Sequence, residues 1–254
     1  MTTQIDHNKL LKKIAKERLK PYGIFQKGQS RTFLYDKGWS TIVIEFQPSS
    51  YSKGTYLNIG VDFNFYPRDY FVFGYGYRET GFEEFRDEEQ FTKLVNDLCD
   101  LTIKRVEELD RKFVDIWIAL KTAEKVKEKD TWRIYEVAIL NALTSNFDKA
   151  RKLLIELSKT KCEYDWENER KKFADQLLEL LQESPASLDK IKNIISQTRK
   201  LKKLPEMTLD NLTESKTTPN KGLAKWRVKA KIVSFSFLFR KKPIILTFFL
   251  NLFN

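Results

Sequence analysis

Residues 55–66 alternate apolar and polar side chains with a period of two. Successive side chains of a β-strand point to opposite faces of a sheet, so this spacing predicts a strand with one apolar and one polar face. The apolar members are Leu57, Ile59, Val61, Phe63 and Phe65. We expect these five side chains to lie beneath a helix that begins near residue 88, and this burial is the expectation on which the rest of the predicted architecture depends.

Three further segments have the β-branched and aromatic composition of strands, namely residues 31–36, 39–47 and 70–78. Pro67 ends the strand at 55–66 because proline cannot donate to a sheet ladder. The connections between the four segments are too short to contain crossover helices. The sequence therefore predicts a four-stranded antiparallel sheet.

Helical periodicity flanks this predicted sheet on both sides. Residues 6–20 carry an apolar stripe after Asp6, a residue type that commonly caps helices. Asp87, followed three residues later by Gln90, predicts the capped start of a helix of more than five turns. We expect both helices to pack on the apolar face of the sheet, and a further helix to follow over Ile116–Lys127.

From residue 130 onward the patterning is helical throughout. A hairpin of two helices with its turn at Ser145 and Asn146 is expected, followed by helices over about 163–183 and 187–203. The predicted fold class is α+β: a four-stranded antiparallel sheet packed by the N-terminal and long central helices, followed by a helical extension.

Composition divides the chain into four predicted parts. Residues 1–128 form the α+β domain, 129–204 the helical extension, 205–222 a linker, and 223–254 a tail of basic and hydrophobic residues. The net charge of +11 is concentrated late in the chain, because residues 201–254 hold eleven Lys/Arg and only three acids. The nearly balanced remainder does not favour strong binding to nucleic acid backbones.

Three interpretations of residues 223–254 remain open. The segment holds seven Lys/Arg and no acid, which is typical of a helix anchored at a membrane surface. It could instead add a strand to a sheet. It could also be an out-of-frame extension without native structure, because an AT-rich coding region read out of frame yields these residue types. A bilayer span is not expected, since it needs roughly 20 apolar residues.

Few residues have the pattern of a catalytic or metal site, and we predict no catalytic residue, cofactor or metal ligand. His7 is the single histidine, which excludes a metal site built from several histidines. Cys99 and Cys162 belong to no paired motif and are predicted to be reduced thiols. The acids at 83–89 precede a helix, where they interact favourably with its dipole, and a metal site is the alternative interpretation.

The polar face of the predicted strand pair is the candidate recognition face. It comprises Gln47, Tyr56, Asn58, Asp62, Asn64 and Tyr66. Such a surface binds a partner or a small ligand, or is ordinary solvated sheet. The aromatic residues at 70–77 suggest an alternative, because exposed aromatics on a sheet can stack RNA bases.

Several short segments resemble a bacterial domain of unknown function, the family DUF4304. They are Gly23-Ile24-Phe25-Gln26-Lys27, Arg31-Thr32-Phe33, Phe46-Gln47-Pro48-Ser49 and Leu57-Asn58-Ile59-Gly60-Val61. The resemblance covers about residues 8–115, and Ile24 departs from the phenylalanine expected after the glycine. It implies an α+β domain and no particular activity.

The function predicted from these features is a non-enzymatic bacterial protein-interaction module of the accessory or immunity type, located in the cytoplasm. Its expected partner is a protein. One alternative is a nucleic-acid-binding module that uses residues 70–77 and the basic tail. A second alternative is a carboxylate- or metal-dependent hydrolase. Contact with a membrane surface is expected only through residues 223–254.

Overall fold

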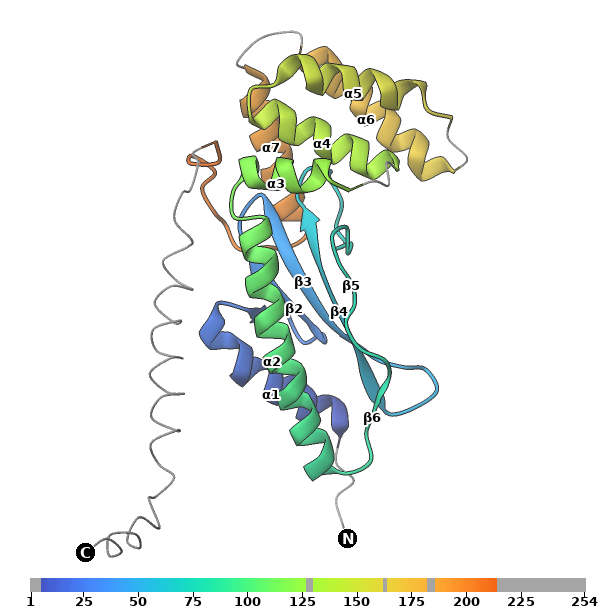
Figure 1. Ribbon diagram of the computed structural model, residues 1–254, viewed down its shortest axis with the longest axis vertical. Coiled ribbons are helices and arrows are strands. Elements are labelled where there is room, and N and C mark those ends of the chain that lie inside the picture. Colours follow the sequence, from blue (N-terminus) through green and yellow to red (C-terminus); the bar gives the residue numbers. More distant parts are fainter. Residues whose placement is uncertain (1–5, 127–129, 162–163, 182–185, 214–254) are drawn as a thin grey trace, which may run out of the picture. The chain divides into compact units, whose positions relative to one another are not determined.

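A computed structural model describes residues 6–126, 130–161, 164–181 and 186–213, and Figure 1 shows the arrangement of their helices and strands. These residues belong to one compact unit that spans Met1–Thr217. The predicted tail at 223–254 and the second half of the predicted linker, residues 214–222, lie outside the described residues.

The sheet is antiparallel and is organised around two long neighbouring strands, β3 (Ser40–Gln47) and β4 (Gly54–Phe63). Strand β2 (Thr32–Asp36) pairs with the other edge of β3, and the two-residue strand β1 (Phe25–Gln26) pairs with β2. Two short strands pair with β4: β5 (Tyr77–Arg78) near its centre and β6 (Glu83–Glu84) at its start.

The α+β class is confirmed, but the prediction of four strands is wrong, because the described residues form six. Strands β1 and β6 are two residues long, which is too short to show a periodic pattern. The expected strand at 70–78 forms a ladder only at β5. Residues 70–76 instead cross beside β4, where the Gly74 and Tyr75 amides both donate to the Val61 carbonyl.

Glycine permits this close crossing. A Cβ atom on Gly76 would lie 2.0 Å from the Ile59 carbonyl oxygen and 2.2 Å from the Gly60 Cα. Such distances exclude any larger residue without movement of the backbone. The glycines between aromatic residues therefore mark close packing of two backbone segments.

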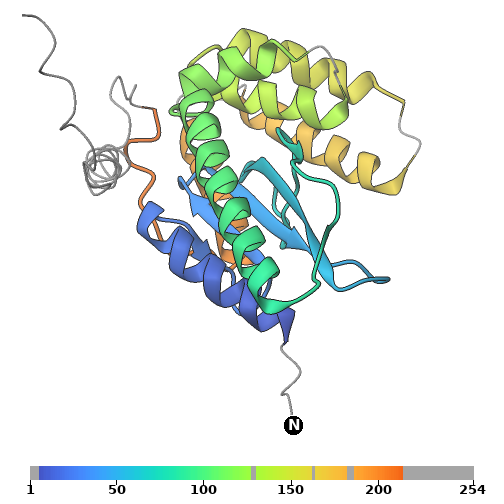
Figure 2. The same ribbon diagram turned by 60° about the horizontal axis from the view of Figure 1, so that its bottom comes forward.

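Helices α1 (His7–Leu19) and α2 (Glu88–Lys112) cover the inner face of the sheet (Figures 1 and 2). All five alternating apolar residues of 57–65 are buried on this face, as predicted. Asp6 caps α1 by accepting the Asn8 amide at 2.9 Å, and Asp87 caps α2 by accepting the Gln90 amide at 2.8 Å. Both predicted helix starts are confirmed.

The remaining helices form the extension beyond the sheet (Figure 1). They are α3 (Ile116–Glu124), α4 (Thr131–Leu143), α5 (Phe147–Lys159), α6 (Asp165–Leu181) and α7 (Ala186–Leu201). Helix α4 lies at the centre of this group, and nearly every one of its side chains is buried, including Glu136 and Asn141. Ser145, in the turn before α5, has a left-handed φ of 65°.

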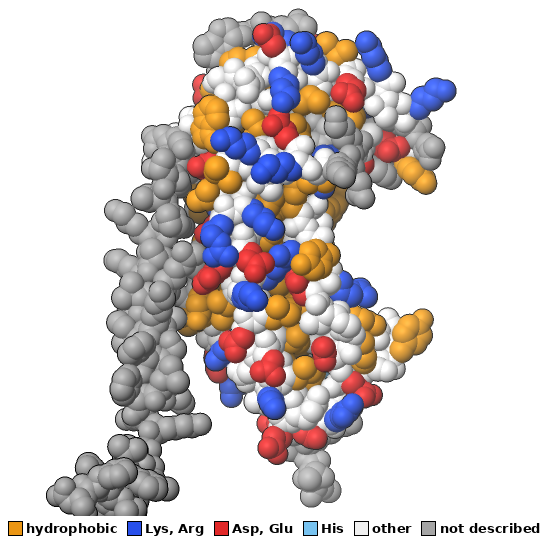
Figure 3. Space-filling model, in the orientation of Figure 1, with side chains coloured by type: hydrophobic (Ala, Val, Ile, Leu, Met, Phe, Trp, Pro, Cys, Tyr) orange, Lys and Arg blue, Asp and Glu red, His pale blue; other side chains and the backbone are white. Residues whose placement is uncertain are grey.

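Among the described residues, no helix is both long enough and apolar enough to cross a membrane. Figure 3 shows that lysine, arginine and acidic side chains are interspersed over the side of the molecule that carries α2. This mixture agrees with the nearly balanced charge of residues 1–200.

Candidate functional site

The outer face of the sheet, which is turned away from α1 and α2, carries the predicted recognition residues. Strand register orders its side chains in cross-strand rows. The first row is acidic and contains Asp36, Thr41 and Asp62. The second is apolar and contains Leu34, Val43 and Gly60. The third and fourth are polar and contain Thr32, Glu45, Asn58 and Arg78, then Gln47 and Tyr56.

The first row is covered by residues that follow α7 in the chain. The Lys202 ammonium group donates to Asp62 Oδ2 at 2.7 Å and to Asn64 Oδ1 at 2.9 Å. Arg68 forms an ion pair with the other oxygen of the same carboxylate, and all four side chains are buried. Burial lowers the pKa of Lys202 to about 8, while the neighbouring Asp62 carboxylate opposes this shift.

A second ion pair binds α7 to the edge of the same row. Arg199 holds both carboxylate oxygens of Asp36, at 2.7 and 2.9 Å, and donates to the Gly38 carbonyl at 2.9 Å. A planar guanidinium group that meets a carboxylate in two parallel hydrogen bonds fixes orientation as well as distance. Arg199 and Lys202 together fix the position of the end of α7 on the outer face.

The second row is covered by apolar side chains. Leu34 and Val43 pack with Leu204, and the partly buried rings of Phe71 and Phe73 lie against them. Tyr75 packs on Phe63 and Phe113. The aromatic residues of 70–77 therefore do not share one exposed surface of the kind that stacks nucleic acid bases.

The third and fourth rows remain partly accessible, with exposed Arg78 and half-buried Glu45, Gln47, Tyr56 and Asn58, and we call these five residues the open region. Its polar side chains are already joined to one another. The Asn58 amide donates to Glu45 Oε2 at 3.0 Å and to Gln47 Oε1 at 2.9 Å. Arg78 donates to Gln47 Oε1 at 2.9 Å, and its guanidinium carbon lies 4.2 Å from the centre of the Tyr56 ring.

The six predicted recognition residues thus fall in three surroundings. Gln47, Tyr56 and Asn58 lie together in the open region. Asp62 and Asn64 are fully buried and bind Lys202 of the same chain. Tyr66 lies beyond the end of β4 and packs edge-to-face on Trp132 and Phe173 of the helical extension.

Sequence reasoning missed Arg199, Lys202 and Arg68, which bind the acids of the first row. One signal was present in the sequence: two carboxylates at alternating positions of strands that are otherwise apolar need cationic partners if they are buried. Nothing in the local pattern indicates which of the many lysines and arginines supplies those partners.

The cysteine, histidine and acidic residues that were considered as reactive or metal-binding groups do not form such a site in the described part of the chain. Burial raises the pKa of Cys99 to about 12, so its thiol is not activated. His7 is half-buried, with its ring 5.5 Å from that of Phe85. The described residues contain no group of three or more His, Cys, Asp or Glu side chains arranged to hold a metal ion.

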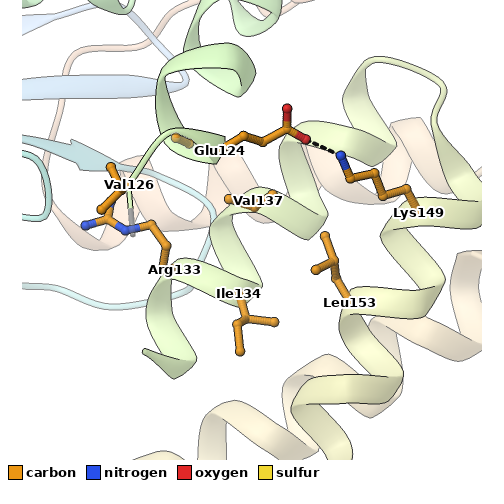
Figure 4. Close-up of a pocket in the computed structure, with 8 residues that line it drawn as sticks. Glu124, Val126, Arg133, Ile134, Val137, Lys149 and Leu153 are labelled. Carbon is orange, nitrogen blue, oxygen red and sulfur yellow. Dashed lines mark hydrogen bonds and ion pairs between the residues drawn. The ribbon is translucent and has the colours of Figure 1, made fainter. Parts of the chain in front are cut away.

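A mainly apolar pocket of about 280 Å³ lies between α3, α4 and α5 (Figure 4). Ala123, Ile134, Val137 and Leu153 contribute its apolar lining. Figure 4 shows the ion pair between Glu124 and Lys149 beside it. The pocket can accommodate an apolar side chain, but none of the six predicted recognition residues lines it.

Comparison with known protein families, with curated protein sequences and with solved structures finds no match to this chain. The resemblance to DUF4304 therefore stays a prediction.

Proposed function

We propose that this chain is a protein-interaction module of the accessory or immunity type, and that the open region is its contact surface. The observation that carries the proposal is the hydrogen-bonded arrangement of Asn58, Glu45, Gln47 and Arg78 on an accessible part of the sheet. Side chains already held in place lose little conformational entropy when a partner binds.

The residue types of the open region support a protein as the partner. Tyrosine and arginine are enriched at interfaces and dominate binding energy there. Tyr56 and Arg78 already stack on each other. The loop between β3 and β4 extends away from the sheet beside them (Figure 1), and it carries Tyr51, whose side chain is 98% exposed. An aromatic side chain at that position can insert into a partner surface.

Site-specific photocrosslinking in extracts of the native host tests this proposal. A photoreactive residue replaces Tyr51 or Asn58 in the full chain, and Lys93, exposed on α2, provides the control position. We expect Tyr51 and Asn58 to give the same protein product, which Lys93 does not give.

The purified partner is then titrated against Tyr56→Ala and Arg78→Ala variants. We expect each variant to weaken binding by about tenfold or more, the loss typical of central interface residues. Unchanged affinity of both variants, or identical products from all three crosslinking positions, would contradict the proposal.

A further inference from the structure

A group of polar side chains is buried where α4 meets the segment that follows β4. We call Arg68, Tyr75, Arg133 and Glu136 the Glu136 cluster. Arg133 Nη1 lies 3.8 Å from Glu136 Oε2. The charges of Arg133 and Arg68 both lower the pKa of Glu136, but burial outweighs them and raises it to about 7. The cluster lies outside the open region, and it shares Arg133 with the pocket between α3, α4 and α5.

The donors in this cluster outnumber the acceptors available to them. Arg68 is 5% exposed and uses Nη2 to bind Asp62, which leaves its Nε and Nη1 buried without hydrogen-bond partners. Nε and Nη1 of Arg133 are also buried without hydrogen-bond partners, whereas the Tyr75 hydroxyl interacts with Arg133 and Glu136. An unsatisfied buried donor destabilises the fold, and more so when it is charged. Four such atoms around one carboxyl group therefore indicate a missing acceptor.

The charges at this location balance when Glu136 is ionised, because Arg68, Arg133 and Lys202 face the carboxylates of Asp62, Asp130 and Glu136. Protonation of Glu136, whose pKa burial raises to about 7, leaves one positive charge in excess. A water molecule can accept hydrogen bonds from the free donors, but only an anion also neutralises that charge.

We propose that a small oxyanion of the phosphate type binds in the Glu136 cluster between Arg68 and Arg133. Guanidinium groups bind such anions through parallel hydrogen bonds, and the anion supplies the acceptors that the free N–H groups lack. Tyr70 and Trp132 border Arg68, with ring centres 5.7 and 4.5 Å from its guanidinium carbon. Tyr70 is 54% exposed, so rotation of its side chain gives a route from solvent.

Thermal unfolding and calorimetric titration of the full chain test this inference. Inorganic phosphate is compared with chloride at equal ionic strength, because excluded salts stabilise proteins without binding to them. We expect a saturable increase in Tm with phosphate alone, since a ligand that binds only the folded state stabilises it according to its dissociation constant.

Arg68→Lys keeps the charge that Asp62 needs but removes the planar set of donors. This substitution should raise the apparent dissociation constant for phosphate by about ten- to a hundredfold, the effect of losing charged hydrogen bonds. Arg133→Lys provides a second variant in case the first does not fold, as judged by its circular dichroism spectrum. Arg105→Lys is the matched control, because Arg105 also stacks on a tyrosine and pairs with acids, but on the α2 side of the sheet.

Loss of the phosphate response in Arg68→Lys or Arg133→Lys, with its retention in Arg105→Lys, would support the site. A response that is absent in the unsubstituted protein, or that all three variants retain, would overturn it. If the unsubstituted protein does not respond to phosphate, the missing acceptors are buried water. If all three variants respond, phosphate binds elsewhere on the surface.

Discussion

Glu136→Gln should remove a pH dependence of stability that the fold builds into α4. Glu136 is 6% exposed, and burial raises its pKa from an ordinary 4.5 to about 7. Between these two pH values the folded protein retains a proton that the unfolded chain releases. The contribution of Glu136 to stability is therefore fully present below pH 4.5 and is lost as the pH rises through 7.

The magnitude follows from the difference between the two pKa values. Each pKa unit corresponds to 1.36 kcal/mol, so a difference of about 2.5 amounts to about 3 kcal/mol of unfolding free energy. Glutamine keeps the shape of the side chain and does not titrate. Relative to the unsubstituted protein, Glu136→Gln should gain about 2–3 kcal/mol of stability between pH 4.5 and pH 7.5.

Urea unfolding followed by tryptophan fluorescence at half-unit pH steps measures this difference. Buffers without phosphate or sulfate keep the effect separate from anion binding in the Glu136 cluster. Glu156→Gln, on the exposed side of α5, is the matched control and should follow the unsubstituted protein at every pH. If Glu136→Gln also runs parallel to the unsubstituted protein across this range, Glu136 does not titrate as its burial requires and the reasoning fails.

Three further predictions follow from contacts in the described residues. Arg199→Ala should lower the unfolding free energy by about 3–5 kcal/mol, because it leaves the buried carboxylate of Asp36 unpaired. Chemical denaturation compares it with Arg151→Ala, which breaks an exposed ion pair and should change the unfolding free energy by about 0.5 kcal/mol or less. Gly76→Ala should lower Tm by several degrees or prevent folding, because the added Cβ would meet the backbone of β4. In the same thermal scan, Gly81→Ala should leave Tm within about 1–2 °C of the original, because there is open space around Gly81. Cys99, whose buried thiol has a pKa raised to about 12, should resist a thiol reagent in the folded protein and react after unfolding, and mass spectrometry of its peptide would detect premature labelling.

Local sequence patterns were enough to predict the inner half of this fold. The period-two apolar residues of 57–65 and the helical stripe of α2 each describe one side of a contact, and burying both sides requires them to face each other. The helix caps Asp6 and Asp87 could also be predicted, because a capping side chain accepts a hydrogen bond from a backbone amide only two or three residues away. These features are local, so a single stretch of sequence contains all the information that they need.

Which polar residues of the outer face stay accessible depends on contacts between segments that are far apart in the chain. Asn58 and Asn64 occupy equivalent positions in the same alternating pattern, yet Asn58 lies in the open region and Asn64 is buried. The difference comes from Lys202, which is 138 residues away from Asn64 in the chain. Periodicity reports which face a side chain is on, but it carries no information about which distant helix covers that face, since that depends on how α7 packs on the sheet.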